Sequence, residues 1–176
     1  QQKGAEKRRG LMIVGVCVLV ALLIVGAAAY RPVKDWWDLR QFNSVDISAI
    51  GAPASSCQDV VTKPATGSQE HVQVGTPVTY DQAPPAFGKH WNQYGVAPAP
   101  MSRKLYTDDR PKIETLVHNL EHGYTILWYD RSVEKEQAAS FEALSTKVNA
   151  MKESANKFII SPWDPAYGAF PEGKKY

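Results

Sequence analysis

The segment Val117–Gly123, which reads VHNLEHG, is the stretch around which the rest of the chain is organised. It holds two of the four histidines, four residues apart, with a carboxylate between them. On a helix turning about 100° per residue, one face collects four apolar side chains: Ile113, Leu116, Val117 and Leu120. The spacing predicts a helix over 112–122, with Pro111 at its first position and Gly123 as the left-handed residue that ends it.

The two histidines lie away from that apolar face. His118 and His122 therefore point to water or to another part of the chain. Imidazoles at positions i and i+4 can bind one metal ion together, and a third ligand must then come from elsewhere. The other interpretation is a pair of surface histidines near a helix C-terminus, where the partial negative charge favours a protonated ring.

An apolar run near the N-terminus predicts a membrane segment. Leu11–Tyr30 contains no charged residue and is just long enough to cross a bilayer. Basic residues precede it, which favours a cytoplasmic N-terminus: Lys3, Lys7, Arg8 and Arg9. The alternative is a cleaved signal peptide, because Ala27–Ala29 resembles a cleavage site. We expect a single-pass anchor in the cell membrane, with the main domain extracytoplasmic.

The composition divides the chain into four parts. We expect a cytoplasmic basic tail over 1–10, the anchor over 11–30, a juxtamembrane segment and linker over 31–69, and the extracytoplasmic domain over 70–176. The sequence begins without methionine and stops at Lys174–Tyr176, so both ends are expected to be trimmed. A net charge of +2 with dispersed basic residues gives no case for nucleic-acid binding. Cys17 and Cys57 are separated by the membrane boundary and cannot pair.

The outer domain reads as a small α/β or α+β fold, with a few-stranded sheet and two main helices. We predict a strand over His71–Val74, a turn over Gly75–Pro77 and a returning strand over Val78–Tyr80. A rigid, proline-rich and aromatic loop spans 83–100, and Tyr124–Tyr129 is a strand covered on both faces. The remaining elements are a helix from the cap Ser132 to about Glu153, with the stripe Ala138, Phe141, Leu144, Val148 and Met151, and a short strand over Phe158–Ile160.

Two motifs carry a family resemblance. Pro84–His90 reads PPAFGKH, and His118–Gly123 reads HNLEHG. The chain resembles a family of mostly actinobacterial, membrane-anchored proteins known as domain of unknown function 3105. That family has Pro-Pro-Thr-Ser-Gly-Pro-His followed by His-Asn-Leu-Glu-His-Gly, so Ala86, Phe87 and Lys89 depart from its pattern. The similarity covers roughly Gly67 to Ile160 and implies a shared fold and histidine site, but no established activity.

The resemblance sharpens a metal-binding hypothesis, because all four histidines match the family pattern. His118 and His122 would supply two ligands and His90 a third. Candidates for the fourth are His71, Glu114, Met101 and Cys57. Zinc and copper are the expected metals, and a methionine ligand would favour Cu(I). Without an ion, the same histidines would hold the proline loop to the helix by hydrogen bonds.

Two other functions fit the sequence. The run His118–His122 matches H-x-x-E-H, in which Glu121 would be the general base of a small metal-dependent hydrolase. The anchor and the aromatic loop also suit an accessory subunit of a larger membrane-protein complex in which the histidines are structural. The sequence has no Gly-rich phosphate loop, no G-x-S-x-G elbow and no C-x-x-C motif. We expect a protein that is not an enzyme, and leave its small-molecule ligand open.

Overall fold

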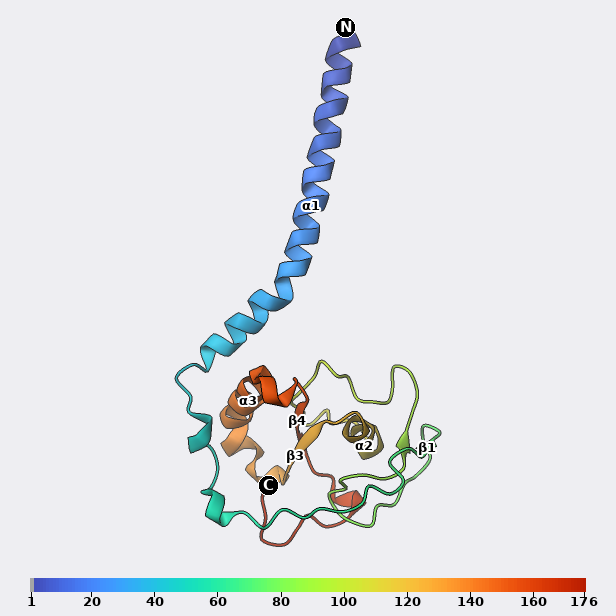
Figure 1. The fold of residues 1–176 in the computed structure, drawn as a ribbon, viewed down its shortest axis with the longest axis vertical. Helices are drawn as coiled ribbons and strands as arrows, with labels where there is room; N and C mark the ends of the chain where they lie inside the picture. The colour runs from blue at the N-terminus through green and yellow to red at the C-terminus, as the bar shows by residue number, and fades with distance from the viewer. Residues whose placement is uncertain (1) are drawn as a thin grey trace. The chain divides into compact units, whose positions relative to one another are not determined.

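The computed structural model describes residues 2–176, with side chains described from Arg8 onward. The chain divides into two compact units, Gln1–Ser44 and Val45–Tyr176. In the first unit, α1 (Gln2–Gln41) is one helix that continues through Pro32 and curves along its length (Figure 1). Its part Arg8–Gln41 is long and apolar enough to cross a membrane, a test that a signal sequence near an N-terminus also meets.

A parallel strand pair forms the centre of the second unit. The strand β3 (Thr125–Tyr129) pairs with β4 (Phe158–Pro162), so that Ile126 lies opposite Ile159. The free edge of β4 takes a further strand-like contact, in which the Tyr106 amide donates to the Ile160 carbonyl at 2.9 Å. The predicted strands after Gly123 are thus confirmed, and β4 lies between two neighbours.

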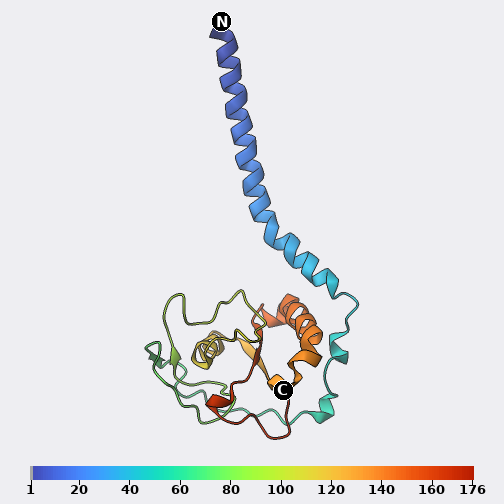
Figure 2. The same ribbon diagram turned by 180° about the vertical axis from the view of Figure 1, so that it is seen from behind.

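Helices cover both faces of this pair. In Figures 1 and 2, α3 (Glu134–Ala150) lies on one side of the strands and α2 (Ile113–Glu121) on the other. Alternate strand residues point to opposite faces. Trp128 and Ile159 pack with α2, whereas Tyr129 and Ile160 pack with Phe141 of α3. The result is a small α+β domain in three layers, and α+β is one of the two fold classes that the sequence predicts.

The helix boundaries follow the sequence prediction with local corrections. Gly123 ends α2 with a φ of 75°, as predicted, but the helix begins at Ile113, so Pro111 is not its first residue. Ser132 is not a helix cap: it sits in a 3₁₀ turn, Arg131–Val133, whose cap is the Asp130 carboxylate. Two positions of the predicted α3 stripe are exposed, Ala138 and Met151. Met151 lies one residue past the end of α3, and Ala138 lies near its start.

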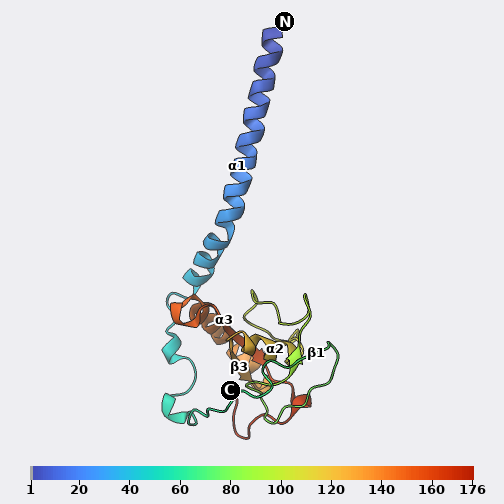
Figure 3. The same ribbon diagram turned by 45° about the vertical axis from the view of Figure 1, so that its right-hand side comes forward.

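The predicted hairpin after His71 is wrong. The strand β1 (His71–Val72) pairs in parallel with β2 (His90–Trp91), and Val78–Tyr80 forms no strand. Figure 3 shows β1 beside α2, away from α3. Two hydrogen bonds from side chains, rather than strand pairing, fix the segment between β1 and β2. The Trp91 indole N–H donates to Thr76 O at 2.8 Å, and the Tyr80 hydroxyl donates to Lys89 O at 3.0 Å. These bonds fix the loop that carries His90.

The packing of α3 gives the first prediction. Phe141 is buried, with its ring centroid 4.5 Å from that of Tyr129. Replacing Phe141 with alanine should lower the free energy of unfolding by about 3–5 kcal/mol, because it leaves a cavity in the core. The matched control is Tyr94→Ala, since the Tyr94 side chain is fully exposed. Equal losses of stability in the two variants, measured by thermal denaturation in detergent, would contradict this core.

Candidate metal centre

Four side chains from three elements meet at one point of the domain. His71 comes from β1, His90 from β2, and His118 and Glu121 from α2. Each offers one ligand atom, and these four atoms lie within 4.8 Å of one another. Glu121 Oε2 is their common neighbour, at 3.2 Å from His71 Nε2, 3.0 Å from His90 Nε2 and 3.8 Å from His118 Nε2.

Backbone carbonyls decide how two of the rings are oriented. His90 Nδ1 lies 2.9 Å from Gly88 O, and His118 Nδ1 lies 2.7 Å from Trp91 O. A carbonyl oxygen can only accept, so each Nδ1 carries the hydrogen and donates it. In a neutral ring the other nitrogen then holds a lone pair. Both Nε2 lone pairs therefore face the carboxylate of Glu121.

While both rings are neutral, that arrangement lacks a positive charge. The lone pair of His90 Nε2 and the oxygen of Glu121 lie 3.0 Å apart, and neither carries a hydrogen while His90 is neutral and Glu121 ionised. His71 is different, because its Nδ1 lies 3.2 Å from the Asn92 amide nitrogen and its Nε2 can donate to Glu121. A cation among the four atoms would convert the repulsion between His90 and Glu121 into attraction.

The site is half enclosed. His90 and His118 are buried, whereas His71 and Glu121 reach the surface. Burial lowers the pKa of His118, and the neighbouring rings of His90 and His122 lower it further. Burial acts to raise the pKa of Glu121, but the hydrogen bond from His71, together with the charge and hydrogen bond of His90 when that ring is protonated, outweighs it and leaves that pKa below its ordinary value. A neutral His118 and an ionised Glu121 are the protonation states that bind a metal.

Two local features place these side chains. The Asn119 side chain is buried and bonds to both backbone groups of Ala99, accepting from its N–H at 3.0 Å and donating to its carbonyl at 3.1 Å. This clamps the proline-rich loop onto α2. Gly88, whose carbonyl orients His90, has a φ of 138°, and a Cβ there would lie 3.1 Å from the Tyr80 ring. Glycine is therefore required at this position.

The other residues predicted as ligands lie apart from the group of four. His122 follows the last residue of α2 and is exposed, with its ring stacked on His118 at 5.0 Å between centroids. Glu114 is buried and accepts a 2.7 Å hydrogen bond from the Tyr167 hydroxyl. Met101 and Cys57 are exposed. Glu121, proposed from the sequence only as a hydrolytic base, takes the central position instead.

Sequence reasoning missed the groups that orient the rings. The Gly88 and Trp91 carbonyls leave no trace in residue type, because any residue has a carbonyl. Asn92 and Asn119 had a detectable signal, because Asn119 directly follows His118 and Asn92 lies two residues after His90. Such amides commonly hold a ligand or its loop in position.

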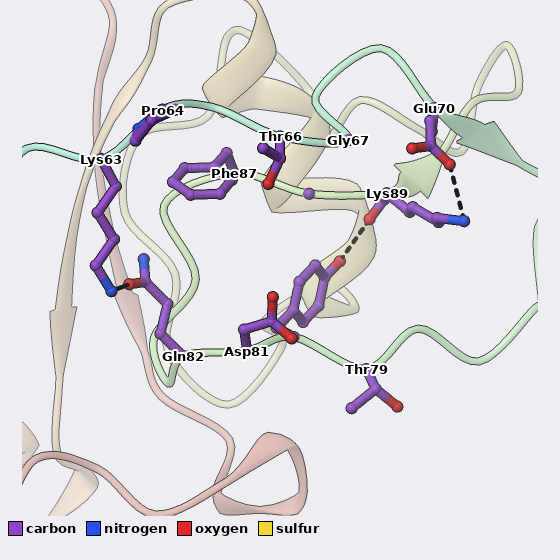
Figure 4. Close-up of a pocket in the computed structure, with 12 residues that line it drawn as sticks. Lys63, Pro64, Thr66, Gly67, Glu70, Thr79, Asp81, Gln82, Phe87 and Lys89 are labelled. Carbon is purple, nitrogen blue, oxygen red and sulfur yellow. Dashed lines mark hydrogen bonds and ion pairs between the residues drawn. The ribbon is translucent and has the colours of Figure 1, made fainter.

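Two pockets lie near this part of the domain. The larger, about 560 Å³, opens between Lys63–Glu70 and Thr79–Lys89 and contains no histidine among its lining residues (Figure 4). An ion pair of 2.8 Å between Lys89 and Glu70 crosses its rim. The smaller, about 280 Å³, is lined by His90 and Glu121. The smaller pocket is thus the one that borders the four-residue group.

Comparison with known families assigns this domain. The model of the family described as "Protein of unknown function (DUF3105)" matches residues 71–166, more than half of the chain. The chain belongs to the DUF3105 family. The matched region begins at His71 and contains all four histidines and Glu121. No curated protein and no solved structure matches the chain significantly. The DUF3105 match supplies the domain's family, and the site's chemistry rests on its geometry.

Proposed function

We propose that the DUF3105 domain binds one zinc or copper ion through His71, His90, His118 and Glu121. The observation that carries this proposal is the pair of buried imidazoles whose Nδ1–H groups are bound by carbonyls while their Nε2 atoms face Glu121 Oε2. Histidines that bind metals almost always donate their other ring N–H in this way, which fixes the tautomer and the direction of the ring.

The spacing of the donor atoms supports four-coordination. A tetrahedral ion with ligands at about 2.0–2.1 Å separates those ligands by about 3.3 Å. The three distances from Glu121 Oε2 are 3.0, 3.2 and 3.8 Å. Only short side-chain movements would be needed to close the four atoms on one ion.

The donor set favours zinc over copper. Three imidazoles and one carboxylate suit Zn(II) and also Cu(II), whereas Cu(I) prefers sulfur ligands. Cys57 is not a member of the group, and Met101 accepts hydrogen bonds from Lys104 and Tyr124 at its backbone carbonyl. We therefore place Zn(II) first and Cu(II) second.

The same geometry argues for a non-catalytic ion. In the H-x-x-E-H hydrolase reading, His118 and His122 bind the metal and Glu121 stays free to activate water. Here Glu121 contacts the histidines, and His122 lies outside the group of donor atoms. With four protein ligands the site resembles the closed structural class of zinc site. The ion would then join β1, β2 and α2. It would either stabilise the domain as a structural ion or be an ion that the protein stores or transfers.

Metal analysis of single variants tests the ligand set. We expect near-stoichiometric zinc or copper in detergent-purified protein by mass spectrometry. His118→Ala and Glu121→Gln should each lower the metal affinity by at least about 100-fold, more than the 10–100-fold typical of changes outside the ligand shell. The matched control is His122→Ala, four residues further on, which should retain the metal.

Three results would contradict the proposal. Loss of metal in His122→Ala would restore the H-x-x-E-H ligand pair. Retention of metal in Glu121→Gln, accompanied by loss of a hydrolytic activity, would make Glu121 a general base. Absence of metal from every sample, even after loading, would leave the histidines as a purely structural group.

We further propose that α1 is a single-pass anchor with a cytoplasmic N-terminus, which places the DUF3105 domain outside the cell membrane. The support is the apolar helix Arg8–Gln41 together with the basic residues that precede its apolar run. Cys17 lies in the apolar run, and Cys57 lies beyond it on an exposed segment.

The two native cysteines test this orientation. A membrane-impermeant maleimide added to intact cells should label the chain at Cys57, and the label should disappear in Cys57→Ser. Cys17 should stay unlabelled until the membrane is dissolved. Labelling of Cys57 only after cell lysis would reverse the orientation, and a mature chain that lacks the residues before Ala29 would indicate a cleaved signal peptide.

A further inference from the structure

The end of α1 continues beyond the proposed membrane segment. The uncharged run over 11–30 spans about 30 Å at about 1.5 Å per residue, which is the thickness of the hydrocarbon core of a bilayer. The helix does not stop there but runs on to Gln41. With 11–30 in the bilayer, residues 31–41 lie outside the hydrocarbon core, and we call them the juxtamembrane helix.

The juxtamembrane helix has two chemically different faces. At about 100° per residue, Val33, Trp36 and Trp37 fall on one side of it, and all three side chains are exposed. The two tryptophan rings lie 6.3 Å apart between centroids and form one apolar patch. The opposite side carries four charged residues: Arg31, Lys34, Asp35 and Asp38. A tryptophan-bearing apolar face opposite a charged face is typical of a helix that lies in a membrane interface.

A proline lies between this helix and most of the run before it. Pro32 is inside α1. Proline removes one backbone N–H and clashes with the carbonyl four residues earlier, so it kinks a helix. Figures 1 and 2 show the last part of α1 turning away from the axis of the earlier part. The juxtamembrane helix can therefore follow the membrane surface while residues 11–30 cross the bilayer.

This bend decides the depth of the tryptophans. A straight continuation at about 1.5 Å per residue would place Trp37 about 10 Å beyond Tyr30. The headgroup region is only about 5–8 Å deep on each side of the hydrocarbon core, so a straight helix would carry the ring into water. Tryptophan concentrates at the headgroup level, because its ring is amphipathic. A helix that lies along the surface keeps both tryptophans at that level.

Arg40 adds a group that suits lipid phosphate. Its guanidinium carbon lies 5.1 Å from the centroid of the Trp36 ring, one turn earlier on the same side of the helix. A guanidinium is a planar donor that matches phosphate oxygens, and its apolar stem packs along neighbouring apolar surface. Lys34, on the charged side, is instead paired with Asp38. The apolar face thus ends in a cation placed for the headgroup region.

We propose that the juxtamembrane helix lies in the headgroup region of the extracytoplasmic leaflet. Val33, Trp36 and Trp37 face the acyl chains, and Arg40 contacts the lipid phosphates. The bound partner is therefore the phospholipid surface itself. The inference rests on the proposed single-pass anchor and is independent of the metal site.

Spin-label accessibility in phosphatidylcholine vesicles tests this placement. The full chain carries serine at both native cysteine positions and one nitroxide label at a single introduced cysteine. Val33→Cys and Trp37→Cys report the apolar face. Lys34→Cys and Asp38→Cys, each one residue further on, are the matched variants on the charged face.

Electron paramagnetic resonance then compares collisions of the label with oxygen and with a water-soluble nickel chelate. Oxygen dissolves among the acyl chains, whereas the chelate stays in water. We expect the oxygen-to-nickel ratio to be at least about threefold higher at positions 33 and 37 than at 34 and 38, because only the apolar face enters the acyl-chain boundary.

The native cysteines supply the reference values. A chain that keeps only Cys17 reports the bilayer interior, and a chain that keeps only Cys57 reports water. Labels at 33 and 37 should give ratios between these two, because an interfacial helix is buried only about 5–10 Å deep.

The outcomes distinguish this inference from the proposed anchor. No difference between the two faces, with ratios equal to that of Cys57, would overturn the inference and leave the anchor standing. Low access of both reagents to positions 33 and 37 would also overturn it, since protein rather than lipid would then cover the apolar face. A Cys17 label as open to the nickel chelate as the Cys57 label would overturn the anchor itself.

Discussion

Two hydrogen bonds between rings and backbone determine the chemistry of this domain. The Nδ1–H groups of His90 and His118 donate to the carbonyls of Gly88 and Trp91, which turns both Nε2 atoms toward one carboxylate oxygen. Without these bonds each ring could rotate and exchange tautomers, and neither Nε2 atom would have a fixed direction. With them, two imidazole nitrogens and one carboxylate oxygen converge before any ion arrives, so little ordering of these groups remains to oppose binding.

The fold around the site explains why such a centre would be useful. β1 and β2 contribute only two residues each, and a pairing that short is weak without further support. The three-layer core lies on the other side of α2, where Leu116 and Val117 pack toward β3 and β4. His118 and Glu121 are therefore positioned by a helix that packs on the core, whereas His71 and His90 lie on the short strands β1 and β2. A shared ion, or the hydrogen bonds alone, would connect β1 and β2 to α2 and so to the core.

Much of the core could be predicted from the sequence, because its signals are local. Helical spacing identified α2, the apolar run after Gly123 identified β3, and Gly123 itself marked the helix end. The site was harder. The i, i+4 rule paired His118 with His122. The helix ends at Glu121, so the His122 side chain does not continue the helical spacing. The meeting of His71 with His90 depends on a parallel pairing across a long loop, which spacing cannot reveal.

The tautomers of His90 and His118 test the central claim most directly. With histidine labelled by nitrogen-15, only four rings contribute to the long-range proton–nitrogen spectrum of the full chain. The spectrum should be recorded on metal-free protein at a pH of about 8.5, well above the usual histidine pKa of about 6.5. The account predicts neutral rings with hydrogen on Nδ1 at both positions. Hydrogen on Nε2 in either ring, or a doubly protonated His90 bound to Glu121, would contradict a site prepared for a metal ion.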